Sequence, residues 1–142
     1  MPLILQHKFS EQDPLSNLNV YYIYMENYKK QGGDIIAKTL RGRTNSLPIT
    51  VKKAHGKLVG TYWEDSDFTW LVAYLDKEFD NIERVLNINH TVIFLEETVN
   101  SSVEYNEEHL KKKSEKLHKY IEDRWRRIIT SYEPKKIYAS TP

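Results

Sequence analysis

The sequence predicts an α+β domain built on a mostly antiparallel sheet of about five strands, with a central meander over residues 35–75. Two observations support this fold class. Short runs rich in β-branched and aromatic residues follow one another between turn signals, and apolar residues recur at helical spacing near 14–31, 76–87 and 103–132. The chain has 142 residues, of which 39% are hydrophobic and 29% charged. These values are typical of a globular protein, so we expect a single domain over residues 1–142.

The N-terminal part is predicted to form a strand and then a helix. Residues 3–9 (LILQHKF) have the pattern of a short strand. Asp13 and Pro14 favour a helix start, because Asp accepts hydrogen bonds from free backbone N–H groups and Pro needs no partner at the first helical position. We expect this helix to cover residues 14–31 and to end at the two glycines that follow. Its weakness is the run VYYIY at 20–24, which suits a strand as well.

The centre of the chain is predicted to contribute most of the sheet. Residues 34–41 suggest one strand, and residues 47–54 and 57–64 suggest a hairpin that turns at His55-Gly56. Residues 68–75 alternate aromatic and polar side chains and are predicted to continue the meander before a helix at 76–87. The alternative is one helix over 68–86, because its apolar residues also fit helical spacing.

The C-terminal part is predicted to contain a buried strand and a long helix. Residues 90–97 (HTVIFLEE) form a nearly continuous apolar run, which is typical of a central strand covered on both faces. The helix is expected over residues 103–132 and ends before Pro134. Its apolar stripe is thin around Leu110 and Leu117. We therefore expect this half of the helix to project from the domain and to support a homo-oligomer.

Basic residues gather in one part of the sequence and suggest contact with nucleic acid. Residues 29–57 contain eight basic side chains and one acidic one, although the net charge of the chain is only +1. Nucleic-acid-binding proteins combine cations for the phosphates with aromatic faces for the bases, and Tyr62 and Trp63 follow this region. An ordinary solvated hairpin, whose lysines discourage strand pairing, explains the same pattern. The candidate nucleic-acid-binding residues are Lys38, Arg41, Arg43, Lys52 and Lys57.

A second reading of the sequence is a module or inhibitor that binds another protein. Exposed aromatic and leucine side chains supply large contact areas at protein interfaces. The candidate partner-binding residues are Tyr21 and Tyr24, on the predicted helix 14–31, and Leu110 and Leu117, on the long helix. The same side chains fill protein cores, so packing inside the domain is the competing explanation.

The sequence contains few features that indicate catalysis. The chain has no cysteine, which excludes disulfides, thiolate zinc sites and cysteine nucleophiles, and its five histidines lack ligand spacing. No phosphate-binding loop or nucleophile elbow is present, and a metal-dependent enzyme is only a remote alternative. We therefore expect a non-enzymatic binding or regulatory protein with no catalytic residues, metal or cofactor. The N-terminus resembles no signal peptide and no segment is apolar enough for a membrane span, so we expect a cytoplasmic protein.

Overall fold

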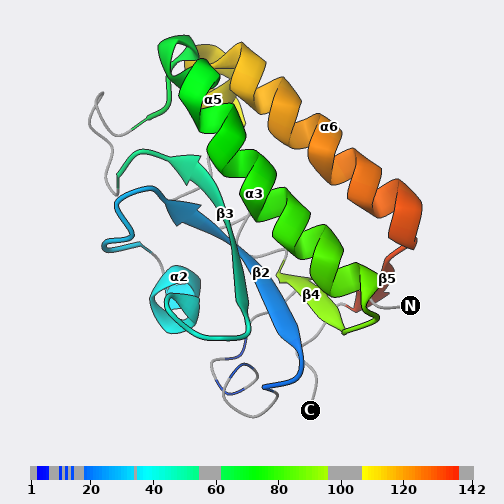
Figure 1. Cartoon of the computed structure of the whole chain (residues 1–142). Helices are drawn as coiled ribbons and strands as arrows, with labels where there is room; N and C mark the ends of the chain where they lie inside the picture. Colours follow the sequence, from blue (N-terminus) through cyan, green and yellow to red (C-terminus); the bar gives the residue numbers. More distant parts are fainter. Residues whose placement is uncertain are drawn as a thin grey trace.

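The computed structural model of the chain describes residues 3–6, 10, 12, 14, 18–33, 35–54, 62–95 and 107–137. Within these residues, five strands form one sheet in the order β3-β2-β4-β1-β5. Every neighbouring pair in this sheet is parallel (Figure 1). The strands are β1 (Leu3–Gln6), β2 (Tyr21–Asn27), β3 (Ser46–Lys52), β4 (Val92–Leu95) and β5 (Lys135–Ile137).

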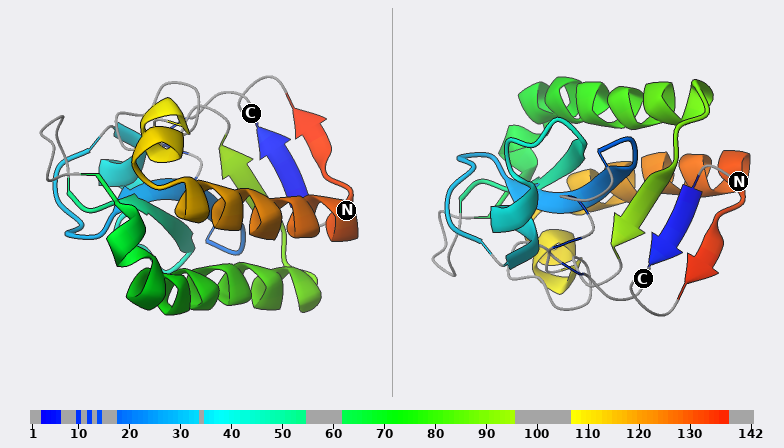
Figure 2. Two further views of the ribbon diagram at one scale, coloured as in Figure 1. Left: turned by 90° about the horizontal axis from the view of Figure 1, so that it is seen from above. Right: turned by 90° about the horizontal axis from the view of Figure 1, so that it is seen from below.

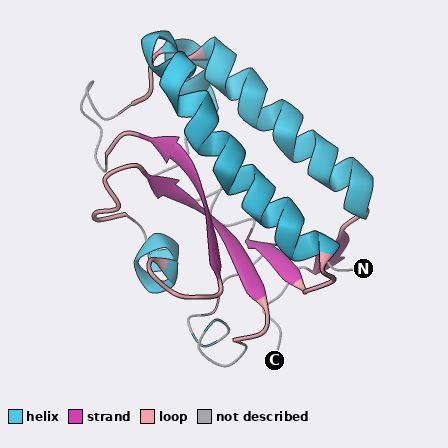
Figure 3. Cartoon of the chain, in the orientation of Figure 1, coloured by secondary structure: helices cyan, strands magenta, loops and turns pink. Residues whose placement is uncertain are grey.

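Helices cover both faces of the sheet. The helices are α2 (Ile35–Leu40), the 3-10 turn η2 (Asp65–Asp67), α3 (Phe68–Asn87), α5 (Glu107–Lys113) and α6 (Glu115–Tyr132). Figure 2 shows α3 and α6 side by side on one face and α2 on the other, and Figure 3 shows the same layers by secondary structure. Two hydrophobic clusters match these layers, a large one beneath α3, α5 and α6 and a smaller one beneath α2. None of the described helices is long and apolar enough to cross a membrane.

The predicted antiparallel meander is wrong, and the domain is α/β with a parallel sheet. Parallel strands need crossover connections, which α2 supplies between β2 and β3 and α3 supplies between β3 and β4. The connections diverge between β2 and β4, because β2 leads to β3 on one side and β4 leads to β5 on the other. This topological switch point is where ligands bind in open parallel sheets, outside the carboxyl ends of the strands.

The predicted helix over 14–31 is also wrong, because residues 21–27 form β2. Six of its seven residues are buried. A strand with helices on both faces buries successive side chains on both sides, so a continuous β-prone run replaces the alternation of a half-exposed strand. The run VYYIY, which weakened the helix prediction, begins this strand.

Two predicted strands are helices. Residues 35–40 form α2 in place of the strand over 34–41, and bury Ile36, Ala37 and Leu40 at helical spacing. Residues 68–75 belong to the 20-residue α3, so the alternative of one long helix is confirmed. The strand expected at 47–54 is confirmed as β3, but it pairs in parallel with β2. Most of its proposed hairpin partner, residues 57–64, lies outside the described residues.

The predictions for the N-terminal strand and for the C-terminal part of the chain are confirmed in part. β1 lies within the strand expected at 3–9, and β4 lies at the centre of the sheet, as expected for residues 90–97. The single long helix over 103–132 is wrong, because Ser114 separates α5 from α6 and the two helices pack against each other. Leu110 and Leu117 are buried in the large core, so this part of the chain does not project.

Candidate ligand-binding site at the carboxyl ends of two strands

The carboxyl ends of the first three strands carry buried polar side chains. Gln6 ends β1, Glu26 and Asn27 end β2, and Lys52 ends β3, and each is at most 2% exposed. Burying polar and charged groups costs free energy unless partners are built around them. Their position beside the switch point makes this end of the sheet the candidate site.

Glu26 is the centre of a hydrogen-bonded network on the α2 face of the sheet. Arg41 donates to both Glu26 carboxylate oxygens, over 2.7 Å from Nε and 2.6 Å from Nη2. The Tyr24 hydroxyl donates to Oε2 over 3.0 Å, and the Asn27 backbone N–H donates to Oε1 over 2.9 Å. Burial and the neighbouring Glu26 carboxylate raise the pKa of the Tyr24 phenol, so this hydroxyl stays a donor. The network fixes α2 and β2 and leaves Glu26 little capacity for a ligand.

Asn27 holds the loop that follows β2. Its side-chain amide donates to the Gln31 carbonyl over 2.8 Å, and its side-chain carbonyl accepts from the Gln31 N–H over 3.3 Å. Lys30, Gly32 and Gly33 have positive φ angles of 55°, 61° and 98°, which lets the loop turn sharply toward α2. The loop from Tyr28 to Gly33 is thus presented at the carboxyl end of β2 by a buried side chain.

Four aromatic rings meet beside this loop. The Tyr28 ring centre lies 5.9 Å from that of Trp63, 5.5 Å from that of Trp70 and 5.2 Å from that of Tyr74. Trp63 and Trp70 are 5.4 Å apart. All four contacts are edge-to-face, the geometry that aromatic quadrupoles favour. Tyr28 and Trp70 are nevertheless 43% and 45% exposed, so the cluster offers ring surface to a ligand.

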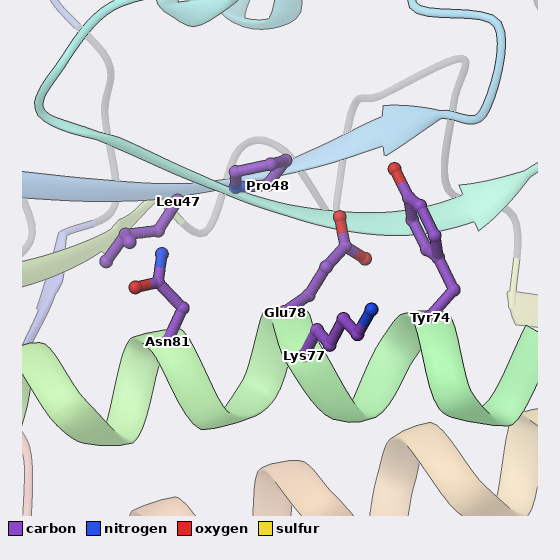
Figure 4. A pocket seen from close by; sticks show the side chains of 6 residues that line it. All are labelled: Leu47, Pro48, Tyr74, Lys77, Glu78 and Asn81. Carbon is purple, nitrogen blue, oxygen red and sulfur yellow. The ribbon is translucent and has the colours of Figure 1, made fainter.

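A cleft of about 420 Å³ opens between α3 and the edge strand β3 (Figure 4). It continues from the aromatic cluster, because Tyr74 belongs to both. Glu78 points from α3 toward β3, where its carboxylate accepts from the Thr50 N–H over 2.8 Å and from the Thr50 hydroxyl over 2.9 Å. Burial raises the pKa of Glu78 to about 7, despite these two hydrogen bonds. The residues that line the cleft are Leu47, Pro48, Tyr74, Lys77, Glu78 and Asn81.

The surface around the aromatic cluster carries both signs of charge. Lys29 and Lys30 are exposed on the loop after β2, and Lys77 is exposed on α3. No ion pair within 4.0 Å joins these three lysines to a carboxylate of the described residues. On the other side, Lys53 is neutralised by Asp67 at 3.1 Å, next to the exposed Glu64 and Asp65. An anion is therefore favoured beside the loop after β2 and beside Lys77 at the cleft, and not beside Glu64 and Asp65.

The structure does not gather the predicted nucleic-acid-binding residues on one surface. Lys52 is 2% exposed, with its ammonium 4.7 Å above the Tyr62 ring, and Arg41 is bound to Glu26. Lys38 is exposed on α2, and Arg43 donates to the Thr39 carbonyl just before β3. Arg43 and Lys52 stand at opposite ends of β3, roughly 20 Å apart. Lys57 lies outside the described residues.

The predicted partner-binding residues are mostly internal. Tyr24, Leu110 and Leu117 are 2%, 5% and 0% exposed, so they are not available to a partner in this structure. Tyr21 is half-buried and packs edge-to-face against His90, with ring centres 5.5 Å apart. These side chains therefore pack inside the domain, which was the competing explanation for their pattern in the sequence.

The residues that form the cleft and the loop are not among the site residues predicted from the sequence. Lys29, Lys30, Gln31 and the two glycines follow a β-prone run directly, and this strand–turn–helix pattern is the signal that could have found the loop. The spacing of three and four between Tyr74, Glu78 and Asn81 predicts only that they lie on one side of a helix. Nothing in the sequence places this side of α3 beside β3.

The fold and this site define a parallel α/β domain with an aromatic and cationic surface at the carboxyl ends of its strands. No group of three or more potential metal-ligating side chains occurs in the part of the chain that the structure describes. The chain belongs to a family of unknown function, DUF7831, whose family model matches residues 4–124. Comparisons with curated proteins and with solved structures gave no match.

Proposed function

We propose that this protein is a non-enzymatic binding protein for nucleotide units, carried either by a free nucleotide or by single-stranded nucleic acid. The supporting observation is the exposed surface of Tyr28 and Trp70 beside Lys29 and Lys30, at the carboxyl end of β2. Bases stack on aromatic rings with little dependence on sequence, and lysines bind the phosphates that join them. This proposal keeps the nucleic-acid function expected from the sequence but assigns it to other residues. We also propose that the protein is cytoplasmic.

Several features of the site favour this ligand class. The loop after β2 is held by Asn27, so little order has to be gained when phosphates bind to it. The Trp63 indole N–H is buried and has no acceptor among the described residues, which leaves a donor beside the exposed rings. Buried hydrogen-bond donors without a partner are uncommon in folded proteins, so this one needs an explanation.

Intrinsic fluorescence tests the proposal directly, because Trp63 and Trp70 both belong to the cluster. The wild type should show quenching on titration with a mixed-sequence single-stranded DNA of 12 nucleotides or with AMP and CMP at about 50 mM salt. Trp70→Ala should weaken binding by about 1–3 kcal/mol, the usual value of one base–aromatic stack. If only the oligonucleotide binds, the ligand is the polymer, and if the nucleotides bind as well, it is the free unit.

The lysines have a matched control on α5. The double variant Lys29→Gln/Lys30→Gln should reduce the slope of log affinity against log salt by about 1.4, from two phosphate contacts on a single strand. Lys112→Gln/Lys113→Gln changes the charge equally at exposed positions of α5 and should keep the wild-type slope. Absence of binding to every probe at about 50 mM salt would refute the proposed function, and equal effects of the two double variants would refute the phosphate contacts of Lys29 and Lys30.

A further inference from the structure

Resting on the proposed function, we propose that the cleft between α3 and β3 selects a cytosine or adenine base. The base would lie against Tyr74, with Glu78 accepting a hydrogen bond from its exocyclic amino group and Asn81 donating one to the neighbouring ring nitrogen. A cleft of about 420 Å³ falls in the range of small-ligand sites. It is larger than one base needs, so a ribose could enter with it.

The edge strand beside the cleft is closed to a peptide. In a parallel pair, alternate residues direct their backbone groups to the neighbouring strand, and the residues between them face outward. Thr50 faces outward, because its N–H donates to Glu78, and so do Ser46 and Pro48 at the same parity. The Ser46 N–H donates to the Arg43 carbonyl over 3.3 Å, and Pro48 has no N–H at all. A peptide therefore finds no free outward donor among these three residues, and strand addition is disfavoured.

Glu78 is a fixed acceptor. Its two oxygens are held by the N–H and the hydroxyl of Thr50, so the carboxylate plane does not rotate freely. Each carboxylate oxygen has two lone pairs, and each uses only one for Thr50. The remaining acceptor capacity suits a ligand N–H, and preorganisation lowers the cost of binding it.

Asn81 is the matching donor. Arg84 donates to the Asn81 side-chain oxygen, over 3.2 Å from Nε and 2.6 Å from Nη2. A guanidinium has no acceptor, so the atom that it contacts is the oxygen and the amide nitrogen is left for the cleft. Figure 4 shows this nitrogen directed toward Leu47. Residues three apart on a helix are neighbours, so Glu78 and Asn81 lie on one side of α3, and Figure 4 shows both side chains directed toward β3.

This acceptor–donor pair distinguishes bases by their Watson–Crick edges. Cytosine and adenine each present an amino donor next to a ring-nitrogen acceptor, which complements Glu78 and Asn81. Uracil and guanine present a carbonyl acceptor next to an N–H donor, which opposes both groups. Proteins read unpaired bases on this edge. Cytosine and uracil are nearly equal in size, so their comparison separates hydrogen bonding from stacking.

The test compares fluorescence-labelled oligo(dC) and oligo(dU) of 12 nucleotides at about 50 mM salt and pH 8, where Glu78 is ionised. The wild type should bind oligo(dC) at least about tenfold more tightly, as one well-placed polar pair discriminates between bases. Glu78→Gln keeps an acceptor and a donor for Thr50 but loses the charged acceptor, and should reduce the ratio to less than about twofold. Asn81→Asp, which keeps the acceptor for Arg84 and removes the donor, should do the same.

Each outcome has one meaning for the proposal. Equal binding of oligo(dC) and oligo(dU) by the wild type overturns the selective cleft but leaves the proposed function standing. Binding of neither oligonucleotide overturns the selective cleft, and the proposed function fails with it if AMP and CMP do not bind either. Glu78 is not the selecting group if a tenfold preference survives in both variants. The same follows if Glu115→Gln, in the exposed first turn of α6, removes the preference equally. Circular dichroism identifies a variant that fails to fold, and the other variant then decides.

Discussion

Removal of the Arg41 side chain should destabilise the fold strongly, because Arg41 neutralises a carboxylate with no access to water. The Glu26 side chain is 0% exposed and the Arg41 side chain is 21% exposed. Arg41→Ala removes two charge-assisted hydrogen bonds of 2.6–2.7 Å and, among the described residues, leaves Glu26 with the Tyr24 hydroxyl and one backbone N–H. Breaking a buried pair by deleting one partner costs about 3–5 kcal/mol. Since small domains are stable by about 5–15 kcal/mol, this loss is a large fraction of the total.

Urea denaturation followed by circular dichroism at 25 °C measures this loss. Arg43→Ala is the matched control, because Arg43 donates one hydrogen bond to the Thr39 carbonyl, and its loss should cost about 1 kcal/mol. Adding Glu26→Gln to Arg41→Ala removes the uncompensated charge and should recover part of the stability. The reasoning is refuted if Arg41→Ala costs no more than Arg43→Ala, or if Glu26→Gln makes the Arg41 variant less stable still.

Two further predictions concern α3 and α6. Burial raises the pKa of Glu78 from 4.5 to about 7, so the folded state binds its proton more tightly than the unfolded state. The stabilisation is complete below about pH 4.5 and is lost as the pH rises through about 7. Relative to Glu78→Gln, the wild type should therefore lose up to about 3 kcal/mol over this interval, and melting temperatures that run parallel with pH would contradict it. Leu117→Ala should cost about 2–5 kcal/mol, whereas the 63% exposed Leu18→Ala should cost less than about 0.5 kcal/mol. Sedimentation should show the same oligomeric state for both leucine variants, and dissociation of a wild-type dimer by Leu117→Ala would restore the interface predicted from the sequence.

The elements with a strong one-dimensional signal could be predicted from the sequence. The apolar run around Val92–Leu95 indicates a strand buried on both faces, and this strand is central. The apolar residues of α3 recur at helical spacing over five turns, so the alternative of one long helix was available from the sequence. The run at 20–24 was ambiguous, because buried parallel strands lack the alternation that separates strand from helix.

The candidate site could not be predicted in the same way. The aromatic cluster joins Tyr28 to Trp63, Trp70 and Tyr74, which are more than 30 positions away in the sequence. The cleft joins Pro48 to Glu78, and only a parallel β3 at the sheet edge with α3 beside it brings these two residues together. An antiparallel meander would have placed different residues at this edge. The error in strand direction therefore became an error in the binding surface.

The sequence by itself determined which segments are apolar enough to be buried, where α3 and α6 end, and that no cysteine chemistry is available. These properties depend on neighbours along the chain, through periodicity, capping and composition. Only the tertiary structure decided the direction of the strands, the burial of Lys52, the pairing of Arg41 with Glu26 and the exposure of Tyr28 and Trp70. Charge and aromaticity are visible in a sequence. Whether a lysine reaches solvent or lies over a ring depends on which distant segments pack against it, because burial is set by contacts across the fold.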